Sequence, residues 1–298
     1  MIGTGNKMQY QDFKKKNSSE PLMLVKKELK RGGNLPLLKF RMLEECGIAE
    51  HCFTTREGGT SNGIFSSLNL SFTRGDHEDA VRENYERLAE ALSVSIGDFV
   101  FTEQTHTTNV IRVGAQDKGK GILKERDYHD VDGLVTNEPG VVLSTFFADC
   151  VPLYFVDPVH KAIGMSHSGW RGTVKRMGLA TIRKMHEEFG TDPESVLAAI
   201  GPSICQDCYE VSEDVAEEFK RAFPGKEDVI LLDKQNGKYQ LDLWKANEIV
   251  LLEAGVCPEH LAVTNVCTCC NPHLLFSHRA SHGKRGNLGA FMYIKKES

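Results

Sequence analysis

Three apolar runs follow one another closely in the middle of this chain, and their spacing limits the folds that it can adopt. The runs are "VVLSTFF" (141–147), "VPLYFV" (151–156) and "AIGMSHS" (162–168). Such short apolar segments, bounded by turn residues, are typical of β-strands. The turn "DPVHK" (157–161) is too short for the crossover that a parallel pair needs, so the last two strands form an antiparallel hairpin. The sheet that contains them cannot be purely parallel.

Helical periodicity alternates with these strands. The segment 77–92 carries apolar residues on one face, and the segment 173–190 does the same with a glycine, Gly190, at its end. We also expect a strand over 195–201 and helices over 212–223 and 243–255.

The mixture of strands and helices predicts an α/β (α+β) fold with mixed β-sheets flanked by helices. No proline- or serine-rich linker and no repeat divides the chain. We therefore expect a polar N-terminal extension over residues 1–25 and a single domain over residues 26–298.

Composition excludes several classes of protein. The net charge of −5 argues against a general nucleic-acid binder, which would usually be basic. No apolar stretch is long enough for a membrane span, and the N-terminus lacks the apolar core of a secretory signal. Nine cysteines without such a signal indicate reduced thiols. We therefore expect a cytoplasmic protein.

Two histidines and a cysteine stand at the ends of predicted strands. His106 precedes the alternating run "NVIRV", Cys150 lies between two strands, and His167 ends the next strand. Hairpin pairing would bring Cys150 close to His167, whereas the approach of His106 does not follow from the sequence. The three form a plausible open zinc site, with the fourth position left for water. A core histidine and a buried cysteine remain the alternative interpretation.

A phosphate-binding site is a second possibility for the segment that contains His167. In "SHSGWRGT" (166–173), Arg171 stands between two glycines at the start of a helix, where unpaired N–H groups attract anions. A surface arginine that closes a turn explains the residue equally well. Arg56 and Asn69 lie in the glycine-rich segment 54–72, which lacks the order of a phosphate-binding P-loop.

Seven motifs, in order, resemble the YfiH/YlmD family, also called the laccase-domain or polyphenol oxidase family. They are "TTREGGTSNGIFSSLNLSF", "EQTHTTNV", "HDVDGLVT", "FFADCVPLYFVDP", "SHSGWRGT", "GPSICQDCYEV" and "FSHRA", and they extend over about residues 50–295. Two segments depart from the usual family pattern: "FSHRA" and the cysteine-rich "CTCC" (267–270). These departures concern the outer part of the substrate pocket.

The resemblance implies a zinc-dependent purine nucleoside phosphorylase acting on adenosine, inosine, guanosine and S-methyl-5′-thioadenosine, with adenosine deaminase activity. Its partners would be a purine nucleoside and phosphate. The family's metal ligands fall on His106, Cys150 and His167. Local sequence suggests Arg171 for phosphate and Asp149 for proton transfer, and the motifs suggest Arg56, Asn69 and Arg279 for binding of phosphate or substrate.

Two other enzymes use the same residues. The ligand set permits Cu²⁺, with Met165 on the strand face of His167, but the chain has none of the His-x-His pairs of a laccase-like polyphenol oxidase. A metal-independent hydrolase would use Cys150 as nucleophile and Asp149 to orient a histidine base. The zinc-deaminase signature is absent from the sequence.

A non-enzymatic metal site is also conceivable. "CQDC" (205–208) and "CTCC" (267–270) are two Cys-x-x-Cys pairs that together would supply four thiolates to a structural zinc. Their separation far exceeds the roughly 15–20 residues of ordinary zinc ribbons. The spacing therefore favours two separate cysteine-rich turns.

Overall fold

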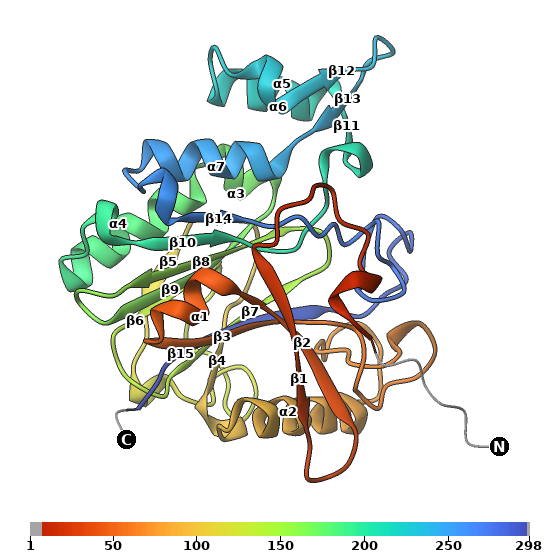
Figure 1. Ribbon diagram of the computed structural model, residues 1–298, viewed down its shortest axis with the longest axis vertical. Coiled ribbons are helices and arrows are strands. Elements are labelled where there is room, and N and C mark those ends of the chain that lie inside the picture. The colour runs from red at the N-terminus through yellow and green to blue at the C-terminus, as the bar shows by residue number, and fades with distance from the viewer. Residues whose placement is uncertain (1–7, 297–298) are drawn as a thin grey trace.

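Two six-stranded β-sheets lie face to face, and helices cover the outer face of each (Figure 1). The computed structural model describes residues 8–296. The first sheet has the order β1 (Leu22–Glu28), β2 (Asn34–Phe40), β3 (Ala49–Thr54), β15 (Leu288–Ile294), β7 (Val142–Phe147), β4 (Phe99–Phe101). The second has the order β14 (Leu261–Val263), β10 (Leu197–Ile200), β8 (Val151–Asp157), β9 (Ala162–Ser168), β6 (Gly133–Thr136), β5 (Val110–Arg112).

Both sheets combine the two strand directions. The pairs β4–β7, β5–β6 and β10–β14 are parallel, and the other pairs are antiparallel. The predicted hairpin is β8–β9, in which Val151 lies opposite Ser168 and Asp157 opposite Ala162. The prediction of mixed sheets flanked by helices is therefore confirmed.

Side chains on the two faces of the central strands belong to two different hydrophobic cores. On β8, Tyr154 and Val156 pack between the sheets, whereas Leu153 and Phe155 face the helices on the other side. Successive side chains of a strand point to opposite faces, so a strand buried on both faces is apolar throughout. This explains why the run 151–156 shows no polar alternation.

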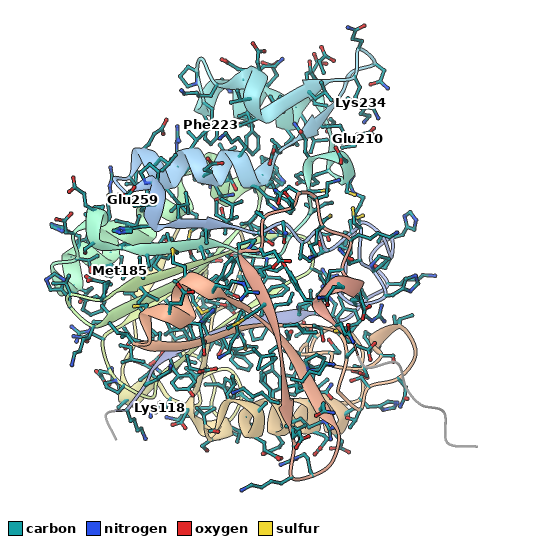
Figure 2. All side chains as sticks on the ribbon, in the orientation of Figure 1. Lys118, Met185, Glu210, Phe223, Lys234 and Glu259 are labelled. Carbon is teal, nitrogen blue, oxygen red and sulfur yellow. The ribbon has the colours of Figure 1, made fainter. Side chains whose placement is uncertain are left out.

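Helices complete the outer layers (Figure 1). On the first sheet, α2 (Glu78–Leu92) buries an apolar face that includes Val81, Tyr85 and Leu88. On the second, α4 (Met177–Phe189) and α7 (Leu243–Glu253) cover the strands. Met185 of α4, labelled in Figure 2, lies where a side chain at Gly164 of β9 would collide with its sulfur. The short helix α1 (Arg41–Cys46) follows β2.

One predicted helix is divided. The expected helix over 173–190 consists of α3 (Trp170–Val174) and α4, with Arg176 between them at φ +64°. The Arg176 guanidinium donates to the Glu253 carboxylate and to the carbonyl of Ala222, so tertiary contacts hold the break. The predicted end at Gly190, in a left-handed conformation with φ +76°, is correct.

A small third sheet stands at the top of the molecule in Figure 1. It contains β11 (Glu210–Ser212), β13 (Lys238–Leu241) and β12 (Leu231–Asp233), with α5 (Glu213–Ala222) and α6 (Glu227–Ile230) beside them. Figure 2 labels Lys234 and Glu210, which form an ion pair here, and Phe223, which joins the core under α7. The region therefore shares the core of the second sheet.

The N-terminal segment is packed against the sheets from Tyr10 onward. Tyr10 and Phe13 are buried in the core between the sheets, and the Tyr10 hydroxyl donates to Asn265 (2.9 Å). The predicted boundary, with the extension ending at residue 25 and the domain starting at residue 26, lies inside β1. Residues 1–7 of the expected extension lie outside the described residues. We propose that the domain includes the described part of this N-terminal segment.

Within residues 8–296, no helix combines the length and the apolar character that a membrane crossing requires.

Candidate metal centre

The structure brings the three predicted metal ligands together. The ligand atoms of His106, Cys150 and His167 all lie within 4.8 Å of one another. His167 is the next-to-last residue of β9 and lies on the face between the sheets, as Ile163 and Met165 do. Cys150 lies where the chain passes from β7 in the first sheet to β8 in the second. His106 arrives on the loop between β4 and β5.

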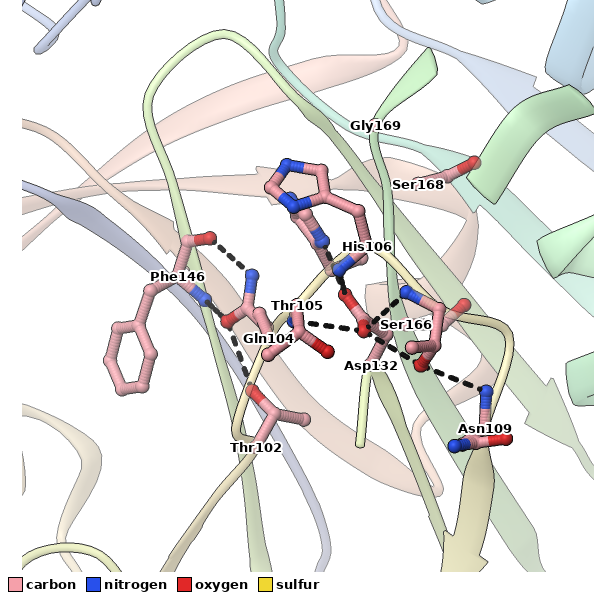
Figure 3. Close-up of polar contacts among 12 residues, drawn as sticks. Thr102, Gln104, Thr105, His106, Asn109, Asp132, Phe146, Ser166, Ser168 and Gly169 are labelled. Atoms are coloured by element: carbon pink, nitrogen blue, oxygen red, sulfur yellow. Dashed lines mark hydrogen bonds and ion pairs between the residues drawn. The ribbon is translucent and has the colours of Figure 1, made fainter. Parts of the chain in front are cut away.

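Asp132 organises both histidines. Its carboxylate accepts a hydrogen bond from Nδ1 of His167 (2.8 Å), which leaves Nε2 as the ligand atom. The same carboxylate accepts the backbone N–H groups of Thr105 (3.1 Å), His106 (3.1 Å) and Thr107 (2.8 Å). Figure 3 shows these contacts converging on Asp132. One buried carboxylate therefore fixes the ring of one ligand and the loop that carries the other.

The loop of His106 needs this support because its backbone is strained. His106 has φ +68°, a conformation that costs on the order of 1 kcal/mol or more in a non-glycine residue. Gln104 adds a second anchor, since its side chain donates to the carbonyl of Phe146 and accepts the N–H of Phe146, both at 2.7 Å (Figure 3). The loop is thus attached to both sheets.

Gly169 is required because a side chain would not fit at this position, and not because of its backbone angles. Its φ of −70° is accessible to any residue. A Cβ at this position would lie 2.8 Å from Cδ2 of His106 and 3.2 Å from the sulfur of Cys150. The glycine two residues after His167 therefore makes room for the other two ligands.

Charge within the cluster favours a thiolate. Burial raises the pKa of Cys150, but His167 and His106 beside it outweigh burial and lower that pKa to about 6. Burial lowers the pKa of His167, yet Cys150 and Asp132 reverse the shift and raise it to about 9. Without a metal, the site thus holds a thiolate–imidazolium pair, and a cation could replace the proton of His167.

The cluster opens on two adjoining cavities of about 340 and 390 Å³. Both are lined by Arg74, His106, Ala148, Cys150 and Arg285, so the ligands stand at their junction. The first cavity adds phenylalanines from the first sheet and its loops, and the second adds Trp170, Tyr209, Asp149 and Arg279. The arrangement can hold a substrate of two parts next to a metal.

Two predicted residues line the second cavity. The Asp149 carboxylate accepts the Thr268 hydroxyl (2.6 Å) and the backbone N–H of Arg279 (2.7 Å). The carboxylate that orients His167 is therefore Asp132, and not Asp149 as the hydrolase hypothesis assumed. The Arg279 guanidinium donates to the carbonyls of Cys208 (3.1 Å) and Glu210 (2.9 Å).

Other predicted residues lie outside the cavity walls. Arg171 is exposed, with its guanidinium 4.2 Å from the centre of the Trp170 ring. The Arg56 guanidinium donates to the carbonyls of Ser66 and Pro272, both at 2.7 Å. Asn69 is buried and holds its loop through Asp76 and the N–H of Asn287. Arg56 and Asn69 thus use their polar atoms to join loops.

Sequence reasoning missed three residues of the site: Asp132, Arg74 and Arg285. Asp132 stands in "HDVDGLVT", and an acidic residue directly before a strand was the available signal. Arg285 is only 8% exposed, and its Nε has no hydrogen-bond partner among the described residues. No local pattern singles it out in "SHGKRGN".

Comparisons with known proteins identify the family of this chain. The family model described as "Multi-copper polyphenol oxidoreductase laccase" matches residues 50–295. "Purine nucleoside phosphorylase YlmD" of Bacillus subtilis is 38% identical over 248 residues, which cover 82% of this chain and 88% of the relative. "Adenosine deaminase RL5" of an unknown prokaryotic organism is 36% identical over 227 residues, covering 76% and 86%.

A solved structure gives the same result. The crystal structure of YlmD from Geobacillus stearothermophilus superposes with a TM-score of 0.82 at 33% sequence identity. The match covers 91% of this chain and 100% of that protein. The chain therefore belongs to the YfiH/YlmD family, the family of the laccase-like polyphenol oxidoreductase model.

Proposed function

We propose that this protein is a zinc-dependent purine nucleoside phosphorylase that also deaminates adenosine. The names of the relatives support both reactions. The observation that carries the proposal is the position of His106, Cys150 and His167 at the junction of two cavities that share two arginines. Inosine, guanosine, adenosine and S-methyl-5′-thioadenosine are the proposed substrates, with phosphate as the second one.

The three ligands fit zinc. Two imidazole nitrogens and one thiolate are a donor set that zinc prefers, and three protein ligands leave a side open toward the cavities. A bound zinc ion would act there as a Lewis acid, which polarises a substrate atom or lowers the pKa of a water. The chain holds the ligand set through Asp132 and leaves space for it at Gly169.

Arg285 and Arg74 are the proposed phosphate ligands, in place of Arg171. Burial of Arg285 and the positive charge of the exposed Arg74 nearby lower the pKa of Arg285 to about 10. An anion between them would relieve this repulsion and use the unpaired Nε of Arg285. Arg171, exposed beside Trp170, would contribute at most at the rim.

The second cavity suits the nucleoside. Trp170 and Tyr209 offer aromatic surface for a purine, with Ile204 and Leu243 next to them. Asp149 lines this cavity, and its carboxylate is the proposed general base. In deamination it would take a proton from the water that adds to C6 and pass it to the leaving ammonia.

In phosphorolysis, a phosphate oxygen bonds to C1′ while the bond from C1′ to the purine breaks. The electron pair of that bond goes to the purine, which then takes up a proton. The arginines would hold and neutralise the phosphate during attack, and the walls of the cavity would exclude water from C1′. The chain itself would contribute to this reaction mainly by positioning the two substrates.

A metal-independent thiol hydrolase is the second candidate. Cys150 lies close to His167, and His167 contacts Asp132, so the three could act as nucleophile, base and orienting carboxylate. A laccase-like oxidase with Cu²⁺ remains the third. Chelation separates the hydrolase from the others, since a hydrolase would keep its activity. Oxidation of a phenol that equals or exceeds phosphorolysis would favour the oxidase.

The experiment is product analysis of inosine and adenosine with and without phosphate and with a chelator. We expect ribose 1-phosphate only with phosphate, inosine from adenosine without phosphate, and loss of both activities on chelation. Arg285→Lys keeps the charge but loses the planar fork, so the KM for phosphate should rise about tenfold or more. Arg171→Lys is the matched control and should change it little. Free ribose formed at the same rate without phosphate would contradict phosphorolysis.

A further inference from the structure

A second group of potential metal ligands lies apart from the candidate active site. The sulfur atoms of Cys205, Cys208, Cys267 and Cys270 all lie within 4.8 Å of one another. The first two cysteines follow β10 and the last two follow β14, and these strands are parallel neighbours. The sequence favoured two separate cysteine-rich turns because of the long interval between them. That expectation is wrong, because the pairing of β10 with β14 closes the interval.

The separations of the sulfur atoms match metal coordination. Cys270 Sγ lies 3.5 Å from Cys208 Sγ and 4.0 Å from Cys205 Sγ. Four sulfurs placed about 2.3 Å from a zinc ion form a tetrahedron with edges of roughly 3.8 Å. A disulfide would need about 2.05 Å. The spacing is therefore that of a tetrahedral thiolate site.

Backbone donors point at one of these sulfurs. The N–H groups of Cys205 and Cys270 lie 3.3 and 3.4 Å from Sγ of Cys267. Donors directed at sulfur stabilise thiolates, and such contacts support the ligands of metal sites. Lys16 lies close by, in an ion pair with Asp207 between Cys205 and Cys208. A cation at this place offsets the excess negative charge that four thiolates give to a divalent metal.

We propose that Cys205, Cys208, Cys267 and Cys270 bind one zinc ion in a closed, structural site. Four thiolates complete the tetrahedral shell of zinc, so no position is left for water or substrate. Cys205 and Cys267 are buried, and Cys208 and Cys270 are half-buried. The site belongs to the loops rather than to the catalytic chemistry, and it does not depend on the proposed function.

The site would brace one wall of the active-site cavity. Thr268, between two of the cysteines, donates to the Asp149 carboxylate, and the N–H of Ile204 donates to the Asp149 carbonyl (3.0 Å). The carbonyl of Cys208 accepts Arg279 (3.1 Å), and Tyr209 follows it directly. A metal at the four cysteines would therefore restrict the positions of Asp149 and Tyr209 through these connections.

The test is elemental analysis of the full-length protein, purified without chelators. We expect two zinc equivalents per chain in the wild type. Cys205→Ser/Cys208→Ser should lose one equivalent, and the matched control Cys269→Ser, next to the site, should lose none. His106→Ala should lose the other equivalent. If the proposed function is wrong, only the result for the zinc ion that His106→Ala should lose is affected. Unchanged zinc content in Cys205→Ser/Cys208→Ser would overturn the four-cysteine site.

The wild type provides a second measurement that does not depend on whether the variants fold. Under native conditions, the four cysteines should resist alkylation until a chelator removes the metal, and the intact mass should show all nine cysteines of the chain as thiols. Alkylation of all four without chelation would overturn the proposal. A mass two hydrogens lighter for each Cys-x-x-Cys pair would replace it with disulfides, and one iron per chain in place of zinc would overturn the choice of metal.

Discussion

The two clusters of potential metal ligands in this protein differ in what surrounds them. His106, Cys150 and His167 offer three ligand atoms and border cavities, whereas Cys205, Cys208, Cys267 and Cys270 offer four sulfur atoms on two loops. A side-chain carboxylate, Asp132, supports the first cluster, and backbone N–H groups support the second. An open shell suits catalysis, and a closed one suits the stabilisation of loops.

Loss of a ligand from the open site should have the largest effect. His106→Ala, Cys150→Ala and His167→Ala should each lower kcat/KM for inosine by about a thousandfold or more, since an incomplete shell loses the metal. The melting temperature should change by only a few degrees, because the ligands border cavities. Steady-state kinetics with zinc analysis checks this. A variant with wild-type activity and zinc content would show that the residue is not a ligand.

Loss of ligands from the closed site should act on stability instead. The metal would link parts of the chain 62 residues apart, as a disulfide does, and such a link contributes about 2–4 kcal/mol. Cys205→Ser/Cys208→Ser should therefore lower Tm by about 5–15 °C in calorimetry. At low temperature the folded variant should keep measurable phosphorolysis, and Cys269→Ser should melt like the wild type. If the double variant melts normally but is inactive, the roles of the two clusters are reversed.

The carboxylate that supports the open site should matter next. Asp132→Asn keeps the shape of the side chain but loses the charge that stabilises a protonated Nδ1 on His167. Loss of such a partner typically costs 10–100-fold in metal affinity or activity. Asp130→Asn, two residues earlier and exposed, is the matched control and should have little effect. Metal titration of both proteins measures the difference, and equal affinities would contradict the role of Asp132.

The smallest effect concerns pH in the metal-free protein. Because the pKa of Cys150 is lowered to about 6, its thiolate fraction, and hence its rate of alkylation, should fall about tenfold from pH 7 to pH 5. The sign follows from the thiolate being the reactive form, which is lost as pH falls through the pKa. Cys257, whose pKa burial raises, should react slowly over the whole range. Alkylation followed by peptide mass analysis tests this, and identical profiles would contradict the thiolate at Cys150.

The sequence by itself determined what depends on local pattern. Apolar runs joined by a short turn required the β8–β9 hairpin, and the hairpin places Cys150 close to His167. Periodicity located α2 and the end of α4 at Gly190. These features depend on interactions between residues that are near in the chain, so a short window of sequence contains their cause. The motifs added the family, and through it His106.

Only the tertiary structure decided which distant segments meet. The order of strands puts β10 beside β14, which gathers the four cysteines that spacing alone kept apart. Packing of one sheet on the other places Arg285 at the cavities and Asp132 under both histidines, while Arg171 stays at the surface. These contacts depend on the register and stacking of whole sheets, and the free energy that selects them is spread over the buried core. No short segment of the sequence contains that information.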